Sequence, residues 1–309
     1  HTSLYYMKRK LVKQGATTLM VSLPAKWAKN NNLDKGDEVE IEEIEETLVI
    51  KSQKKEVKKE TNIKITTGTE TTIRTIITNT YRLGYSKVNV EFQNEEEFKT
   101  LSNTIRSKLL GFEIISKEKN KCVIENITEP SAEHAENIFL KILYNISQLL
   151  EKTEQLFKRE DAFEDIKDIE VKIYQYDNFV RRIKYLENNQ KTPMFWLFQT
   201  ELIHAQRDIY FIAKYLHDNK DVNVSKETIE YFKELCKLFE MLKEGYFKRD
   251  IAMLEKIHDV EKELVYKKGY DLLSTKKGKE QIIIYRITSS IRGFYLASSP
   301  LIGLLLDKA

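Results

Sequence analysis

Hydrophobic and polar positions follow three different periods along the chain, and each period marks a zone. Between residues 7 and 52, apolar residues recur in short alternating stretches, which is the pattern of half-buried strands. A short helix is expected at Ala25–Asn30, before the run of asparagines that ends it. The strands are expected at Lys10–Lys13, at Leu19–Leu23, around Val39 and Ile41, and at Thr47–Ile50. So small a β unit buries little surface alone, which favours a dimer.

The second zone, residues 60–128, mixes both periods. Ile73, Ile76, Ile77 and Tyr81 fall on one face of a predicted helix. The predicted helices are 70–83 and 95–110, and the predicted strands are 62–66, 88–92, 112–116 and 122–126. The order βαβαββ is typical of a small α/β domain with its helices on one face of a sheet. The segment Glu129-Pro130-Ser131 closes this zone.

The third zone, from residue 132 onward, has only the helical period. Pro193 favours a helix start, and Ser225 is a good N-cap for the next helix. Residues 164–170 and 255–261 share a pattern of Glu, Ile, Asp, an aliphatic residue and Glu, which suggests two related three-helix units. Six helices are expected, near 132–157, 161–188, 194–218, 226–247, 250–274 and 279–306.

Composition narrows the class of protein. The 309 residues are 41% hydrophobic and 32% charged, and the net charge is only +3, so any basic patch must be local. Two distant cysteines, Cys122 and Cys236, favour a reducing cytoplasmic compartment. The uncharged stretch from Phe294 to Leu306 is shorter than the ~20 residues of a membrane span, so we expect no membrane insertion. Residues 1–6 resemble a vector remnant before a start at Met7.

The N-terminal zone is basic at one end and acidic at the other. Lys8, Arg9, Lys10 and Lys13 fall within six residues that contain no acid, whereas the acids crowd residues 34–46. In a two-fold dimer the basic ends could form one cationic surface for DNA phosphates. On charge alone, a solvated basic arm explains the same run.

The same zone carries a second pattern beside its charge. Lys-x-Gly, then Val-Ser-Leu-Pro-x-x-Trp, then Asn-x-Leu-x-x-Gly-Asp-x-Val-x-Ile resembles the AbrB/SpoVT family of regulators and antitoxin DNA-binding domains. The residues that carry the pattern are Lys13, Gly15, Val21, Leu23, Pro24, Trp27, Leu33, Gly36, Asp37, Val39 and Ile41. The resemblance covers residues 7–52. It implies a swapped-hairpin homodimer that lays basic side chains on double-stranded DNA.

By position in that family, five side chains would contact DNA: Lys8, Arg9, Lys10, Lys13 and Lys26. Four of them are lysines, and lysine lacks the bidentate fork with which arginine reads guanine. We therefore expect weak sequence specificity.

The remaining chain resembles the archaeal type of PhoU-like phosphate-uptake regulator, which carries an AbrB-like domain at its front. Tyr81-x-x-Gly84-Tyr85 and the segment 106–114 carry this resemblance best. It implies a multidomain α+β protein that controls phosphate transport. The expected domains are an AbrB/SpoVT-like domain at 7–52, an α/β domain at 60–128, and a PhoU-like six-helix domain of two three-helix bundles at 131–309.

The PhoU resemblance also implies metal clusters on the helices. Candidate ligands are Glu164 and Asp168 on the second helix and Glu255, Asp259 and Glu263 on the fifth. Four carboxylates that the family carries on its third helices are replaced here, by Gln206, Tyr210, Tyr285 and Ser289. Hard cations need several anionic ligands, so we favour solvated or paired acids over a cluster. The alternative is a divalent or ferric metal on the fifth helix.

Catalytic patterns are weak in this sequence. None of the four histidines after residue 6 has a metal or triad partner by spacing: His134, His204, His217 and His258. Residues 276–279 are basic but lack the pattern of a phosphate-binding loop. We therefore expect no enzyme and no cofactor.

Three functions remain open on this basis. The first is a homodimeric transcription regulator of phosphate uptake. The second is an adaptor that docks on a phosphate ABC transporter subunit, with the N-terminal domain serving dimerisation. The third is metal storage or sensing by the helices.

Overall fold

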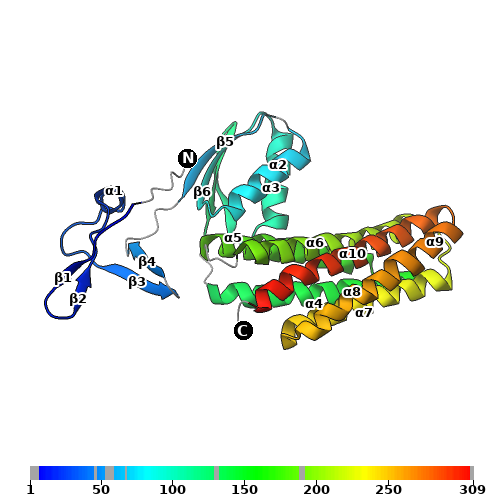
Figure 1. Cartoon of the computed structure of the whole chain (residues 1–309). Helices are drawn as coiled ribbons and strands as arrows, with labels where there is room; N and C mark the ends of the chain where they lie inside the picture. The colour runs from blue at the N-terminus through cyan, green and yellow to red at the C-terminus, as the bar shows by residue number, and fades with distance from the viewer. Residues whose placement is uncertain are drawn as a thin grey trace. The chain divides into compact units, whose positions relative to one another are not determined.

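The computed structural model describes residues 7–44, 47–52, 59–66, 68–128, 132–187 and 192–306. The chain divides into two compact units, an N-terminal unit His1–Val57 and a C-terminal unit Lys58–Ala309 (Figure 1). The expected vector remnant at residues 1–6 and the expected boundary at 129–131 lie outside the described residues.

The N-terminal unit consists of two antiparallel hairpins and one short helix. The first hairpin joins β1 (Val12–Gln14) to β2 (Thr18–Met20), and Gly15 takes a left-handed φ of 70° in its turn. Helix α1 (Ala25–Asn30) has the predicted bounds. The second hairpin joins β3 (Val39–Ile44) to β4 (Thr47–Ser52).

The first two strands are shorter than predicted. The sequence pattern predicted Lys10–Lys13 and Leu19–Leu23, but cross-strand pairing runs only from the pair Val12 and Met20 to the turn. Beyond Met20 the chain leaves the hairpin and enters α1 through Pro24, whose fixed φ suits a helix start. Alternation of side chains marked the correct segment but could not mark where pairing stops.

The C-terminal unit begins with the predicted βαβαββ order, which the structure confirms. Its elements are β5 (Glu60–Lys64), α2 (Glu70–Arg82), β6 (Lys87–Glu91), α3 (Glu95–Lys108), β7 (Phe112–Lys117) and β8 (Lys121–Asn126). The sheet order is β5-β6-β8-β7, with β5 parallel to β6 and the other pairs antiparallel. Apolar side chains of α2, α3 and the sheet, such as Ile77, Leu101 and Val88, form one buried core.

Helices make up the rest of the C-terminal unit, at the places that the helical period predicted. They are α4 (Ala132–Phe157), α5 (Phe163–Glu187), α6 (Thr192–Asp218), α7 (Lys226–Lys248), α8 (Ile251–Lys262), α9 (Tyr270–Thr275) and α10 (Lys279–Leu306). Ser225 caps α7 as predicted, because its side chain accepts a hydrogen bond from the Thr228 amide. The helices share one hydrophobic core. Their division into two three-helix bundles stays a prediction.

The predicted fifth helix, 250–274, is not one regular α-helix. A π-helical segment, Glu263–Gly269, separates α8 from α9. Leu264 and Val265 are consecutive and both buried there, because the wider turn rotates both toward the core. Helical spacing alone could not predict this change of pitch.

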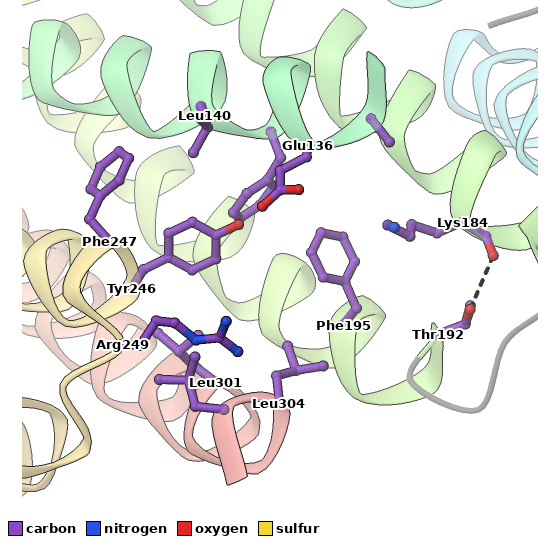
Figure 2. Close-up of a pocket in the computed structure, with 13 residues that line it drawn as sticks. Glu136, Leu140, Lys184, Thr192, Phe195, Tyr246, Phe247, Arg249, Leu301 and Leu304 are labelled. Atoms are coloured by element: carbon purple, nitrogen blue, oxygen red, sulfur yellow. Dashed lines mark hydrogen bonds between the residues drawn. The ribbon is translucent and has the colours of Figure 1, made fainter. Parts of the chain in front are cut away.

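Residues of helices α4, α5, α6, α7 and α10 line a cavity of about 410 Å³ (Figure 2). Within the described ranges, the molecule contains no helix with the length and apolar character needed to cross a membrane.

Candidate nucleic-acid interface

The basic run of the N-terminal unit is fully displayed on its surface. Lys8, Arg9 and Lys10 precede β1, Lys13 lies within it, and all four are exposed. Lys13 pairs across the hairpin with Leu19, so a cation and an apolar side chain share one face. None of these four side chains bonds or ion-pairs with another described residue. Their charges are therefore available to an external anion.

Lys26, the fifth predicted DNA contact, lies on a different element. It is exposed at the second position of α1, after β2 and Pro24. The residue that caps this helix, Asn31, links it to the second hairpin. The Asn31 side chain donates to the Trp27 carbonyl (2.8 Å) and accepts from Ser52 at the end of β4 (3.1 Å). The second hairpin thereby fixes the segment that carries Lys26.

The acidic end of the unit is equally well separated in the structure. Asp37 accepts a hydrogen bond from the Asp34 amide (2.8 Å) and closes the turn before β3. Glu38, Glu40 and Glu43 then follow as exposed side chains on and before β3. Carboxylates would repel the phosphates of DNA, so the basic β1 segment is the part of this unit whose charge favours DNA binding.

Apolar side chains of this unit are more exposed to solvent than those of a domain that is stable as a monomer. Leu11 is 64% exposed, Leu19 62%, Ile41 59% and Leu48 67%. Among its described residues, none is classed as buried. At roughly 25 cal/mol per Å² of apolar surface, leaving these side chains uncovered forfeits the main driving force for folding. Both hairpins therefore require a covering surface.

The candidate metal ligands are spread over exposed helix faces. On α5, Glu164 pairs with Lys167 (2.6 Å), and Asp168 is exposed. Glu255 and Asp259 are exposed on α8, and Glu263, at the start of the π-helical segment, pairs with Lys267 (2.5 Å). In the part of the chain that the structure describes, no group of three His, Cys, Asp or Glu side chains could hold a metal ion.

An arginine on the last helix pairs with an acid that the metal pattern did not include. Arg286 of α10 donates to Asp208 of α6 (2.6 Å), and Ser289 donates to the other oxygen of the same carboxylate. The Ser289 side chain thus takes part in an internal hydrogen bond. The Arg286 guanidinium supplies the positive charge of this contact, which joins α6 to α10.

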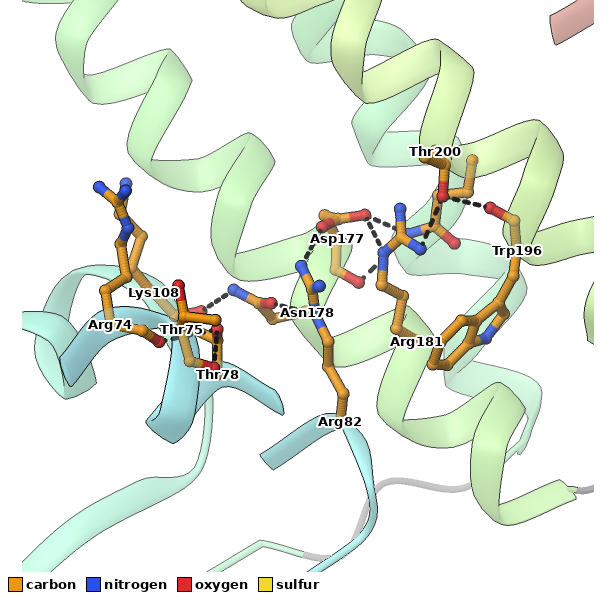
Figure 3. A network of polar contacts seen from close by, with 11 residues as sticks. Arg74, Thr75, Thr78, Arg82, Lys108, Asp177, Asn178, Arg181, Trp196 and Thr200 are labelled. Atoms are coloured by element: carbon orange, nitrogen blue, oxygen red, sulfur yellow. Dashed lines mark hydrogen bonds and ion pairs between the residues drawn. The ribbon is translucent and has the colours of Figure 1, made fainter. Parts of the chain in front are cut away.

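A buried polar network joins the α/β part of the C-terminal unit to its helices (Figure 3). Arg82 of α2 donates to Asp177 of α5 (3.0 Å) and to the side-chain oxygen of Asn178 (2.7 Å). Asn178 in turn donates to the Lys108 carbonyl at the end of α3 (2.9 Å). Burial lowers the pKa of Arg82, and the Asp177 charge opposes that shift.

The neighbouring Arg182 adds further contacts between α5 and the α/β part of the C-terminal unit. It is 1% exposed and donates to the carbonyls of Tyr81 (2.7 Å) and Tyr85 (2.9 Å) at the end of α2. These partners lie 101 and 97 residues away in sequence, so spacing gave no signal of them. These contacts tie the end of α2 and the turn after it to α5.

Comparison with known proteins gives one match. A family model described as Antidote-toxin recognition MazE, bacterial antitoxin, matches residues 12–58. The matched stretch falls on the N-terminal unit and supports the AbrB-like domain predicted at 7–52. No curated protein and no solved structure was found to match the chain. The likeness of residues 60–309 to PhoU-like regulators stays a prediction.

Proposed function

We propose that this protein is a homodimeric, DNA-binding transcription regulator and not an enzyme. The observation that carries the proposal is the MazE-type match over a unit whose basic β1 segment is exposed and has no partner among the described residues. Pairing through the exposed apolar side chains of both hairpins would cover them and bring two basic segments together. Such a surface binds the sugar-phosphate backbone of double-stranded DNA.

The chemistry of the basic segment sets the kind of binding. Lys8, Lys10 and Lys13 are point charges, and Arg9 is the one guanidinium in the run. Phosphate contacts would therefore dominate over base reading, and affinity would depend strongly on salt. Base-specific contacts, if any, fall to Arg9.

The C-terminal unit would carry the signal to which the regulator responds. The resemblance at Tyr81, Gly84 and Tyr85 supports phosphate uptake as the regulated process. In the structure Arg182 binds two of the carbonyls of this motif, those of Tyr81 and Tyr85. A regulator of this kind works in the cytoplasm, where the DNA is. A phosphate transporter gene beside the coding gene is the observation that tests the pathway.

Fluorescence anisotropy with labelled double-stranded DNA tests the central proposal. The variant K8A/R9A/K10A/K13A should lose at least tenfold in affinity at about 100 mM salt, and its affinity should depend less on salt. A matched control removes four exposed lysines of the C-terminal unit: Lys119, Lys226, Lys256 and Lys262. Equal affinities of the two variants would refute a DNA role for the β1 segment.

A second candidate is an antitoxin, which the matched family's description favours. An antitoxin would neutralise a partner protein as well as bind DNA. Co-expression with each adjacent gene separates the two functions. Growth arrest by a neighbour that this protein relieves would favour the antitoxin, whereas no such neighbour would favour the regulator alone.

The adaptor is the remaining alternative, in which the first unit serves dimerisation only. A wild-type protein that sediments as a dimer, fails to bind DNA even at low salt, and binds a purified transporter subunit would favour it. The exposed apolar hairpins alone are compatible with this reading.

A further inference from the structure

A cavity lies among the helices of the C-terminal unit, outside the N-terminal unit that we propose binds DNA. It is lined by residues of α4, α5, α6, α7 and α10 and measures about 410 Å³, within the range of small-molecule sites. Its walls are mostly aromatic and aliphatic, and six of these side chains are Phe139, Leu140, Phe195, Tyr246, Leu301 and Leu304. An apolar hollow of this size with a few charged groups is the usual form of a ligand site.

Arg249 enters the cavity from the turn between α7 and α8 (Figure 2). Its backbone is left-handed, with φ 55° and ψ 38°, a conformation that a helix end normally gives to glycine. The turn is firmly held, because the Asp250 side chain accepts from the Met253 amide (3.0 Å) and the Asp250 amide donates to Gly245 (3.1 Å). These bonds fix the backbone of the turn, so the Arg249 side chain starts from a defined point on the cavity wall.

A second arginine with left-handed backbone shows what such a residue does when its role is structural. Arg159, with φ 67°, donates to the carbonyls of Lys220 and Val222 and ties down the loop before α7. Arg249 makes no hydrogen bond or ion pair with any described residue. Arg249 thus differs from Arg159, because its guanidinium has no hydrogen-bond or ion-pair partner among the described residues and is left for a ligand.

Glu136 supplies the opposite charge from α4. It has no hydrogen bond or ion pair with another described residue, and Figure 2 shows it on the other side of the cavity from Arg249, near Tyr246. The pKa of Tyr246 is raised to about 12, mainly by burial and also by the Glu136 charge, while the Arg249 charge opposes the rise. The Tyr246 hydroxyl therefore feels both charges and stays a hydrogen-bond donor at neutral pH.

The remaining cation of the cavity already has a partner. The Lys184 ammonium binds Glu187 (2.7 Å) on its own helix, α5. One guanidinium and one carboxylate thus remain for a ligand. Both side chains are exposed to solvent, so water can solvate either one alone, and a ligand with a carboxylate and an ammonium group is the kind that can pair with both at once.

We propose that this cavity binds a zwitterion with an apolar body, of which an aromatic α-amino acid is the simplest. Its carboxylate pairs with Arg249, its ammonium group pairs with Glu136, and its ring packs among Phe139, Phe195 and Leu304. This role goes beyond DNA binding and gives the C-terminal unit a small-molecule effector.

Isothermal titration calorimetry of the full chain with three probes tests the proposal. L-phenylalanine carries both charges, 3-phenylpropanoate lacks the ammonium group, and 2-phenylethylamine lacks the carboxylate. Wild type should bind L-phenylalanine at least tenfold more tightly than either analogue. Arg249→Gly should remove this preference over 2-phenylethylamine, and Glu136→Gln should remove the preference over 3-phenylpropanoate.

Two controls separate binding from folding. Arg249→Gly relieves the left-handed strain, so its Tm should not fall while its affinity does. Glu151→Gln removes another exposed acid of α4 and should leave all three affinities unchanged. The proposal is overturned if no probe binds wild type, if the three bind alike, or if both site variants keep the wild-type preferences. DNA plays no part in these titrations, so their outcome is independent of the proposed regulator function.

Discussion

The Arg82 guanidinium lies 3.0 Å from the Asp177 carboxylate, and this contact joins the α/β part of the C-terminal unit to its helices. Asp177 is 1% exposed and also accepts from Arg181 (2.8 Å) and Gln199 (2.8 Å). One buried carboxylate thus balances two arginines from α2 and α5. When one member of a buried ion pair is removed, the charge of the other member stays buried without a counter-charge.

Asp177→Ala should therefore destabilise the protein strongly. We expect a loss of about 3–5 kcal/mol in the free energy of unfolding, because Arg82 and Arg181 would lose their counter-charge. Urea unfolding followed by circular dichroism measures it. Glu70→Ala is the control, since Glu70 pairs with Arg74 at 4.0 Å on the surface, where such pairs contribute about 0–1 kcal/mol. Similar losses in the two variants would contradict the assigned role of Asp177.

Leu19→Asp should disrupt the dimer. Leu19 is 62% exposed in one chain, and a surface leucine in solvent would tolerate an aspartate, whereas one buried between two copies would not. Sedimentation velocity should show a shift toward monomer, with a matching loss of DNA affinity. Ile115→Asp, at a position 51% exposed on β7, should leave the dimer unchanged. A dimer that survives Leu19→Asp would place the interface elsewhere.

Gly15→Val should weaken the first hairpin. The turn holds this residue at φ 70°, and no atom lies within 4 Å of an added Cβ, so the cost is backbone strain alone. We expect about 1–2 kcal/mol for valine and less for asparagine, which visits this conformation more readily. Thermal unfolding and DNA anisotropy of Gly15→Val and Gly15→Asn test this order. Equal effects of the two substitutions would show that strain is not the cause.

Both cysteines should be unreactive in the folded protein. Burial raises the pKa of Cys236 to about 12 and that of Cys122 to about 11, from 9.0. Titration with a thiol-disulfide reagent at pH 8 should be slow for the native chain and fast in urea. Since the unfolded chain loses these protons first, stability should fall as the pH rises from about 9 toward 11. Rapid native labelling would contradict the burial of both thiols.

The elements with a strong period were predictable from sequence. Helices α1 and α4 have the predicted bounds, and Ser225 caps α7, because these features depend on residues close in the chain. The extent of the first hairpin was not predictable from sequence, since Leu19 and its neighbours lack a buried face within one chain. The alternation of polar and apolar residues defines the extent of a strand clearly only where one face of that strand is buried against another surface.

The candidate sites also differ in how far the sequence could predict them. The basic run at Lys8–Lys13 is contiguous, and its exposure could be expected. Arg82 and Asp177 lie 95 residues apart, and only the fold brings them together. Nothing in the sequence indicated Arg249, because its proposed role in ligand binding rests on its backbone angle and on the lack of a partner among the described residues.

The π-helical segment Glu263–Gly269 has a consequence for how this chain tolerates changes of length. Each π turn holds about one residue more than an α turn over a similar rise, so this stretch contains a surplus residue. A single deletion at exposed Tyr266 could be absorbed by a return to α-helical pitch, with α9 and α10 kept in register on the core. The same deletion in α4 would rotate every later core residue of that helix by roughly 100°. The π-helical segment is therefore the place where this chain can lose one residue while the other helices keep their packing.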